Sequence, residues 1–304
     1  MNAAIRAITR KAIHEGYNVF GIERGFEGII NKEIKPLLRR HVGGIITTGG
    51  TMLKTARYTD FKKEETQKEA YSILKSYGID CLFVLGGDGS MAGAKALSNL
   101  GLPTITIPCT IDNDMIGTQM TIGFDTAINT VVQCIGKIRD TSSAHERVAI
   151  VEVMGRHAGH IALQSGLAAG AEVVLVPEHP TPLLEVCERL NETHQNGKSY
   201  SVIVVAEGAY NGYEVSDFIK QHTYFDPNVT VLGYLQRGGA PTAVDAILAA
   251  NMSDVAVNSM KRGEYDRVIG YIDGLVRAIP YDEAPLFTYP ISEEKYELIS
   301  ILSS

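Results

Sequence analysis

The strongest constraint on the fold is a regular alternation between short apolar runs and segments with helical periodicity. The apolar runs are rich in β-branched residues and are bounded by Gly, Pro or Asp, which is typical of buried parallel strands. A strand followed by a helix implies a βαβ unit, whose helices cover the faces of a parallel sheet. The expected helices are Asn2–Glu15, Glu64–Tyr77, Ser90–Leu100, Asp125–Arg139, His157–Ala169, Pro182–Gln195 and Ala243–Met260; the expected strands are Asn18–Ile22, Cys81–Leu85, Thr104–Ile107, Val148–Val153, Val173–Val176, Val202–Val205, Val229–Leu232 and Val268–Ile272.

Eight strands are many for one sheet in a chain of 304 residues, so we expect two α/β domains. No low-complexity linker separates them. In open α/β sheets, ligands bind beyond the carboxyl ends of the strands. The residues that follow each strand are therefore the candidates for function.

The composition excludes several classes of protein. The net charge is −7 and no Lys/Arg-rich block is present, which argues against a nucleic-acid scaffold. No apolar stretch reaches the roughly 18 residues that a membrane span needs. The four cysteines have no metal-ligand spacing and suit a reducing compartment. We expect a cytoplasmic protein that binds anions through local arginine clusters.

A glycine-rich turn follows the strand Cys81–Leu85. It reads Gly86-Gly87-Asp88-Gly89-Ser90 and leads into a helix with Gly93 in its first turn. Glycines let the backbone approach a phosphate, and the helix N-terminus offers free N–H groups. Asp88 is a candidate ligand of Mg²⁺. The alternative is a plain strand-to-helix turn capped by Ser90.

An acidic loop, Asp112-Asn113-Asp114, follows the strand Thr104–Ile107. Carboxylates at i and i+2 point to opposite sides of an extended backbone, so the two need not share a role. One can take a proton from a substrate hydroxyl while the other supports a metal or the geometry. An Asx-rich turn without function is the alternative.

Arginines flank several of the strands. Arg156 follows Val148–Val153, Arg147 precedes it, and Arg237 follows the strand at Val229–Leu232. An arginine at a strand end is well placed for bidentate contact with an anion. Together with the glycine-rich turns and the acidic loop, these residues favour phosphoryl transfer over the alternative of ordinary surface charges.

Five motifs in succession resemble those of the 6-phosphofructokinase family, and the resemblance covers the whole chain. The motifs are Gly86-Gly87-Asp88-Gly89-Ser90, Pro108-x-Thr110-Ile111-Asp112-Asn113-Asp114, Asp140-Thr141-x-Ser143, Val153-Met154-Gly155-Arg156 and Leu235-Gln236-Arg237-Gly238-Gly239. The resemblance implies the phosphofructokinase fold, with two Rossmann-like domains and mostly parallel sheets. It implies a larger nucleotide-binding domain at 1–123 plus 236–286 and a smaller sugar-phosphate-binding domain at 124–235 plus 287–304.

The resemblance also implies an activity, the transfer of the ATP γ-phosphoryl group to the 1-hydroxyl of fructose 6-phosphate with Mg²⁺ as cofactor. Asp112 resembles the base, Thr110 and Arg156 the groups that bind the transferring phosphoryl, and Asp114 their neighbour. The residues that resemble nucleotide contacts are Arg57, Tyr58, Gly87, Gly89, Ser90 and Gly93, with Asp88 supporting the metal and Phe26 beside the adenosine. Those that resemble sugar-phosphate contacts are Arg147, Met154, Gly155, Arg156, Glu207, Asn228, Tyr234 and Arg237.

Oligomerisation follows from the same resemblance, because Arg147 matches a phosphate contact lent by a neighbouring subunit. We therefore expect a homotetramer. A second anion site, for ADP or phosphoenolpyruvate, is expected between subunits. Clustered arginines repel each other unless an anion lies among them, and ordinary surface charges are the alternative. The residues that match this effector site are Arg6, Arg10, Arg39, Arg139, Glu172 and Lys198.

Four positions bear on the choice of substrates. Gly89 leaves room for ATP where pyrophosphate users of the family carry Asp, and Cys109 matches neither branch. Asn228 and Tyr234 stand where an Arg and a His usually bind the sugar 6-phosphate. A pyrophosphate-dependent relative, or a relative that uses another sugar phosphate, remains an alternative.

The start of the chain departs from the family pattern. Members of the family place a strand and a Gly-Gly-Asp turn before the segment that matches Met1–Arg6. Here the first helix would have no cap and would carry an ammonium at its positive end. We interpret Met1 as an internal methionine and expect exposed strand edges. A catalytically weak or regulatory paralogue is the alternative, although a mere binder has no need of Asp112.

Overall fold

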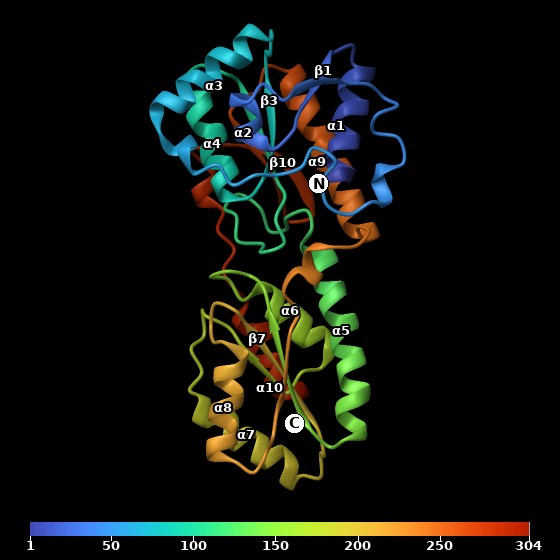
Figure 1. The fold of residues 1–304 in the computed structure, drawn as a ribbon, viewed down its shortest axis with the longest axis vertical. Helices are drawn as coiled ribbons and strands as arrows, with labels where there is room; N and C mark the ends of the chain where they lie inside the picture. The colour runs from blue at the N-terminus through green and yellow to red at the C-terminus, as the bar shows by residue number, and fades with distance from the viewer. Residues whose placement is uncertain (304) are drawn as a thin grey trace. The chain divides into compact units, whose positions relative to one another are not determined.

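The computed structural model describes residues 1–303 and divides into two compact units. Each unit combines segments that are distant in sequence, as the colours of Figure 1 show. Unit 1 consists of Met1–Thr110, Met115–Gly123 and Gly239–Tyr289, and unit 2 consists of Ile111–Asp114, Phe124–Gly238 and Pro290–Ser304.

Unit 1 contains a four-stranded sheet in the order β10-β9-β4-β3. The strands β3 (Leu82–Gly86), β4 (Thr104–Pro108) and β9 (Arg267–Ile272) run parallel, and β10 (Leu275–Pro280) is antiparallel to β9. A two-residue hairpin joins β9 to β10 at Asp273 and Gly274, with φ of 51° and 81°. This left-handed backbone is what the twist of a tight hairpin requires.

Helices cover this sheet in two groups. The helices α1 (Asn2–His14) and α9 (Ala243–Lys261) share a core with β4 and β9, built on Ile8, Ile105 and Met252. The helices α2 (Gly25–Ile30), α3 (Glu64–Ser76) and α4 (Asp88–Asn99) enclose a second apolar cluster, in which Leu74 and Leu97 are fully buried. The 3₁₀ helices of unit 1 are η1 (Ile45–Thr47), η2 (Thr59–Lys62) and η4 (Ala284–Leu286).

The prediction that Asn18–Ile22 is a buried parallel strand is wrong. This segment forms β1 (Val19–Ile22), which is partly exposed and pairs antiparallel with β2 (Ile34–Leu37) in a separate two-stranded sheet. The apolar run resembles a core strand, but within residues 1–303 its hydrogen-bonded strand partner is β2, and it lies outside the four-stranded sheet. Pro36 is tolerated because β2 pairs on one side only.

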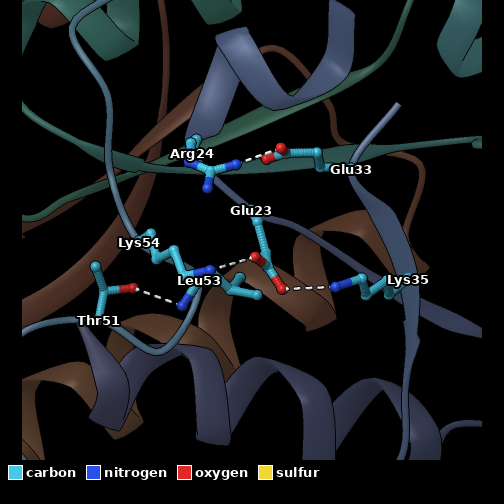
Figure 2. A network of polar contacts seen from close by, with 7 residues as sticks. All are labelled: Glu23, Arg24, Glu33, Lys35, Thr51, Leu53 and Lys54. Atoms are coloured by element: carbon cyan, nitrogen blue, oxygen red, sulfur yellow. Dashed lines mark hydrogen bonds and ion pairs between the residues drawn. The ribbon is translucent and has the colours of Figure 1, made fainter. Parts of the chain in front are cut away.

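Charged side chains fasten this small sheet to the loop that follows it, as Figure 2 shows. Glu23 accepts hydrogen bonds from Lys35 Nζ at 3.0 Å and from Lys54 Nζ at 2.8 Å, and Arg24 pairs with Glu33. The contacts with Lys54 and then Lys35 lower the pKa of Glu23 from 4.5 to about 2. The carboxylate is therefore tied to two segments of the chain at once.

Within residues 1–303, β3 pairs with β4 alone and is an edge strand of the sheet. A cavity of about 730 Å³ lies beside this edge, lined by residues of α1, β1 and β3. The start of α1 has no side-chain cap. Instead, the buried Asn2 side chain donates to Thr48 O and Gly49 O and accepts from Met52 N, which holds the helix start against the following loop.

Unit 2 is built on a fully parallel sheet in the order β6-β7-β5-β8. Its strands are β5 (Val148–Val153), β6 (Val173–Leu175), β7 (Ser201–Ala206) and β8 (Asn228–Val231). On one face, α7 (Leu183–Gln195) and α8 (Gly212–His222) bury Leu190 and Ile219 against the sheet. The remaining helices are α5 (Phe124–Ala144), α6 (His160–Ala169), α10 (Glu293–Leu302) and the 3₁₀ helix η3 (Gly233–Arg237).

The prediction of an α/β fold with mostly parallel sheets is confirmed. Each expected helix is present, and the other seven expected strands lie in the two four-stranded sheets. The elements α2, α8, α10, β2 and β10 were not predicted. No helix within residues 1–303 combines the length and the apolar content needed to cross a bilayer.

Candidate active site

The glycine-rich turn of unit 1 joins β3 to α4. Gly87 is the N-cap residue of α4, and its carbonyl accepts from Ser90 N at 2.9 Å and Met91 N at 3.0 Å. A Cβ on Gly86 would lie 2.2 Å from Ser90 Oγ, so this tight turn requires glycine there. Gly89, in contrast, faces open space, with nothing within 4 Å of a Cβ. The turn thus presents the exposed N-terminal backbone of α4, where an anion is favoured.

A packed aromatic pair stands beside this turn. Phe26 stacks on Phe61 with ring centroids 4.0 Å apart, and a Cβ on Gly93 would lie 2.5 Å from the Phe26 ring. Gly93 is therefore needed so that the ring can lie directly on α4. Tyr58 is half-buried in the same cluster, and Arg57 is exposed next to it. The predicted nucleotide contacts of unit 1 thus include both a packed apolar surface, formed by the Phe26 ring, and the exposed guanidinium of Arg57.

Asp88 is the exposed first residue of α4. No group of three His, Cys, Asp or Glu side chains that could hold a metal occurs in residues 1–303. Mg²⁺ commonly takes one or two carboxylates together with water and substrate phosphates. A single carboxylate beside an anion-binding turn has the donor chemistry for a metal that arrives with the nucleotide.

The exit of β4 is tied to the same turn. Cys109 N donates to Gly86 O at 2.9 Å, and Thr121 Oγ1 donates to Thr110 O at 2.7 Å. The Cβ position of Gly87 lies 3.7 Å from Thr110 Cβ. Burial raises the pKa of the Cys109 thiol to about 11, so this cysteine is a packed apolar residue and not a nucleophile.

In unit 2 the acidic loop meets the predicted phosphoryl-binding arginine. Asp112 is only 4% exposed, and its Oδ2 lies 3.3 Å from Arg156 Nε. Asn113 has φ of 54°, so the loop is a turn and the alternation of an extended strand does not apply to Asp112 and Asp114. The structure therefore brings together a buried carboxylate and an arginine whose side chain remains 55% exposed.

Side chains from two other segments hold the turn that carries Arg156. Three successive backbone N–H groups follow β5, and each donates to a side-chain oxygen. Met154 N donates to Gln236 Oε1 at 3.1 Å, and Gly155 N and Arg156 N donate to Glu207 Oε1 at 3.1 and 2.8 Å. Glu207 thus contacts the backbone of this turn, which the sequence did not reveal, and Gln236 was absent from the predicted site altogether.

The turn is also sterically enclosed. Arg156 has a left-handed backbone with φ of 55°, which is uncommon for a residue with a side chain. A Cβ on Gly208 would lie 2.1 Å from Arg156 O, and a Cβ on Gly155 would lie 2.4 Å from Ala158 O. The surrounding backbone therefore fixes the direction in which the Arg156 side chain leaves the turn.

The helix η3 presents Tyr234 and Arg237. Tyr234 is 81% exposed, and the Arg237 guanidinium lies 5.5 Å from the centre of its ring, a cation–π contact. The two neighbours of Gln236 in the chain, Leu235 and Arg237, are both exposed, whereas Gln236 is 1% exposed. The side chains of η3 thus divide into exposed groups and one buried amide.

Two predicted sugar-phosphate contacts lie elsewhere in unit 2. Arg147 precedes β5, and Asn228 opens β8, where it pairs in register with Ala149. Both therefore lie at the amino ends of the parallel strands, whereas Met154, Arg156 and Glu207 follow the carboxyl ends. A strand of this length spans roughly 15–20 Å. One subunit does not place Arg147 and Asn228 beside Arg156.

The predicted effector residues of unit 2 contact the short segment between α6 and β6 or belong to it. Lys198 Nζ lies 2.6 Å from Oε1 of the buried Glu172, whose other oxygen accepts from Val202 N. Arg139 donates to Gly170 O at 2.8 Å, and its buried Nε has no hydrogen-bond partner within residues 1–303. In unit 1, Arg6 and Arg10 lie one helical turn apart on α1, and Arg39 follows β2.

A glycine-rich turn before a helix in unit 1, and a buried carboxylate paired with an arginine in unit 2, are features that phosphotransferases use. The family model for phosphofructokinase matches residues 1–260. The chain is 49% identical over 303 residues to an ATP-dependent 6-phosphofructokinase of Clostridioides difficile (strain 630), and 47% identical over 303 residues to ATP-dependent 6-phosphofructokinase 1 of Clostridium perfringens (strain 13 / Type A). Each match covers 100% of this chain and 95% of the relative. The chain belongs to the phosphofructokinase family.

Solved structures agree with this assignment. The phosphofructokinase of Saccharomyces cerevisiae superposes with a TM-score of 0.87 at 34% identity, over 93% of this chain and 43% of that chain. A pyrophosphate-dependent phosphofructokinase from Marinobacter aquaeolei superposes with a TM-score of 0.85 at 22% identity, over 100% of this chain and 88% of that chain. The second likeness supports the fold alone.

Proposed function

We propose that this protein is an ATP-dependent 6-phosphofructokinase of glycolysis. It transfers the γ-phosphoryl group of ATP to the 1-hydroxyl of fructose 6-phosphate and releases ADP and fructose 1,6-bisphosphate. The observation that carries the proposal is the pairing of Asp112 with Arg156, in a chain that matches ATP-dependent 6-phosphofructokinases along its whole length.

Asp112 is the base of the proposed reaction. Its carboxylate accepts the proton of the sugar 1-hydroxyl as the sugar oxygen forms its bond to the γ-phosphorus, and the bond between that phosphorus and the ADP oxygen breaks. Arg156 and Thr110 bind the oxygens of the transferring phosphoryl group. Asp114 supports the loop that holds Asp112. Because these groups are positioned before the substrate arrives, they need little reorganisation during transfer.

The donor is proposed to be ATP held at the β3–α4 turn. The backbone of Gly87, Gly89 and Ser90 faces the phosphates, while Arg57, Tyr58, Phe26 and Gly93 shape the nucleoside side. Asp88 would hold Mg²⁺, which when bound neutralises charge on the phosphates. The open space at Gly89 supports ATP over pyrophosphate, because no side chain fills the room that the nucleotide needs.

The acceptor site is proposed to be completed by a second subunit. Met154, Gly155, Glu207, Tyr234 and Arg237 face the sugar phosphate from one subunit. Arg147 and Asn228 lie at the other end of the same sheet, which supports their donation to a neighbouring subunit's site. We propose a cytoplasmic homotetramer whose effector site for ADP or phosphoenolpyruvate uses Arg6, Arg10, Arg39, Arg139, Glu172 and Lys198.

The test measures ADP formation by the purified chain with ATP, Mg²⁺ and fructose 6-phosphate, beside reactions with pyrophosphate as donor. ATP-dependent turnover that is lost in Asp112→Asn is the expected result. Turnover with pyrophosphate alone would identify a pyrophosphate-dependent relative. Nucleotide binding without turnover on any sugar phosphate would identify a regulatory paralogue and overturn the proposal.

A further inference from the structure

Gln236 is the one side chain of η3 that is removed from solvent, yet it is polar. It is 1% exposed, whereas Tyr234, Leu235 and Arg237 around it are exposed. A buried amide without partners is costly, so the contacts of this side chain reveal what keeps a polar group there.

Both ends of the Gln236 amide are used. Its Oε1 accepts from Met154 N at 3.1 Å, and its Nε2 donates to Gly233 O at 3.1 Å. The partners fix the orientation of the amide, because a backbone N–H can only donate and a carbonyl can only accept. Only a side chain with both a donor and an acceptor satisfies this pair of contacts, so neither Glu nor a hydrocarbon replaces it.

The two contacts join segments that carry different parts of the proposed site. Met154 begins the turn that ends in Arg156, and Gly233 begins the helix that presents Arg237. A second backbone link, from Leu232 N to Glu152 O at 3.1 Å, lies just before these contacts. Apart from this backbone link, among the described residues, the Gln236 amide is the side chain whose hydrogen bonds join η3 to the turn.

We propose that Gln236 is a positioning residue, which holds Arg237 and the Met154–Arg156 turn in register through its side-chain amide. The proposal rests on the proposed function. Gln236 touches no reacting atom in it. Its role is to fix the distance between the arginine that binds the sugar phosphate and the arginine that binds the transferring phosphoryl group. A loss of that register should affect the sugar phosphate and the transferring phosphoryl group more than the rest of the nucleotide, whose predicted contacts belong to unit 1.

Two variants and a matched control test this role. Gln236→Met keeps the length and bulk of the side chain and removes both hydrogen bonds. Gln236→Glu keeps the shape but loses the donor and places a carboxylate against Gly233 O. Gln221→Glu introduces the same chemical change at an exposed position of α8. Each protein is characterised by steady-state kinetics, thermal unfolding and hydrogen exchange.

We expect both variants at position 236 to raise the KM for fructose 6-phosphate about three- to tenfold, the range for one or two lost hydrogen bonds. The KM for ATP should stay within twofold of the parent value, and Gln221→Glu should match the parent in every measurement. If Gln236→Glu does not fold, the KM of Gln236→Met for fructose 6-phosphate alone tests the proposal. Unchanged KM for the sugar phosphate, with or without a lower Tm, would overturn the proposal, and so would a Gln236→Met protein that fails to fold.

Hydrogen exchange separates this inference from the proposed function. The amide of Met154 should exchange faster in Gln236→Met than in the parent, while amides in β3 and α4 keep their protection. This readout does not depend on turnover. If the parent protein has no phosphofructokinase activity, the proposed function is refuted. The exchange rate of the Met154 amide would then still test whether Gln236 holds the turn. Equal exchange at Met154 in parent and variant would refute the contact itself.

Discussion

Arg156 Nε lies 3.3 Å from Asp112 Oδ2, and the two residues differ sharply in exposure: the Asp112 side chain is 6% exposed and that of Arg156 is 55% exposed. The pairing holds the buried carboxylate, which we propose as the base, in place, and it leaves most of the arginine side chain accessible for the proposed contact with phosphoryl oxygens. This relationship makes the carboxylate the first target for mutation.

Asp112→Asn should leave the fold intact and lower kcat by about 10²–10⁴-fold, the usual contribution of a general base. The amide has the shape of the carboxylate but cannot take the proton. The KM values for both substrates should change far less than kcat. Steady-state kinetics check this result, with Asp217→Asn on the exposed face of α8 as the matched control. A variant that keeps more than half of the parent's kcat would show that another group is the base.

Two glycine substitutions should change stability in opposite directions. Gly93→Ala places a methyl group 2.5 Å from the Phe26 ring, so we expect a loss of about 1–3 kcal/mol of unfolding free energy and a higher KM for ATP. Gly136→Ala lies in the exposed middle of α5 with nothing within 4 Å, so we expect a gain of about 0.5–1 kcal/mol. Thermal or denaturant unfolding of the two variants checks both signs. Equal stability of the two would contradict the close contact at Phe26.

Asn228→Arg should lower the KM for fructose 6-phosphate about tenfold, because it restores a charge-assisted contact to the 6-phosphate. Asn228→Gln, which is longer but uncharged, is the control and should change KM little. Since Asn228 lies at the amino end of β8, the gain should require the assembled oligomer. Steady-state kinetics are measured at protein concentrations above and below the dissociation constant of the oligomer. Analytical ultracentrifugation identifies the oligomeric state at each concentration. An equal gain in monomers would place residue 228 in its own subunit's site.

Glu23 should make unit 1 sensitive to acid. Lys54 and Lys35 lower its pKa in the folded protein from 4.5 to about 2. A depressed folded pKa gives stability that is complete above the unfolded value of 4.5 and is lost as the pH falls toward about 2. Because the two lysines that pair with Glu23 are exposed, high salt should weaken the effect.

Thermal unfolding of Glu23→Gln across this pH range is the measurement. The variant should be less stable than the parent at neutral pH, and the difference should vanish near pH 2. Glu65→Gln, on the exposed start of α3, is the control, because no ion pair of Glu65 is found within residues 1–303. Parallel stability curves for Glu23→Gln and the parent throughout this range would rule out the network of Figure 2 as the cause.

The sequence predicts the order of most elements because periodicity is a local signal. The strands β5 and β7 appear as nearly continuous apolar runs, interrupted only by Glu152 in β5 and Ser201 in β7, since both faces of each are largely buried. The run at Val19–Ile22 carries a similar signal but pairs with β2, since strand partners are set by tertiary contacts that a single apolar run does not specify. The helix α8 is mostly polar and the strand β10 is interrupted by Arg277, so both leave a weaker pattern.

The residues of the candidate site also differ in how well the sequence predicts them. Charged residues such as Asp112 and Arg156 stand out in the sequence because each comes shortly after an apolar strand, where ligands of open α/β sheets bind. The residues that hold them do not stand out. Gln236 is an ordinary amide until its two partners are known, and Glu207 contacts the Arg156 turn only because β5 and β7 are neighbours. Spatial partners of this kind need the folded structure.

The discontinuity of the two units has a consequence for biosynthesis. The sheet of unit 2 is complete once β8 has been made, at Val231, whereas the sheet of unit 1 lacks β9 and β10 until Pro280 leaves the ribosome. Domains usually fold from the N-terminus as they are synthesised. In this chain the central portion can form its sheet first, while the first hundred residues wait for their partners. Nascent chains stalled after β8 has left the ribosome but before β9 has done so should therefore show protease resistance in the middle of the sequence and not at its beginning.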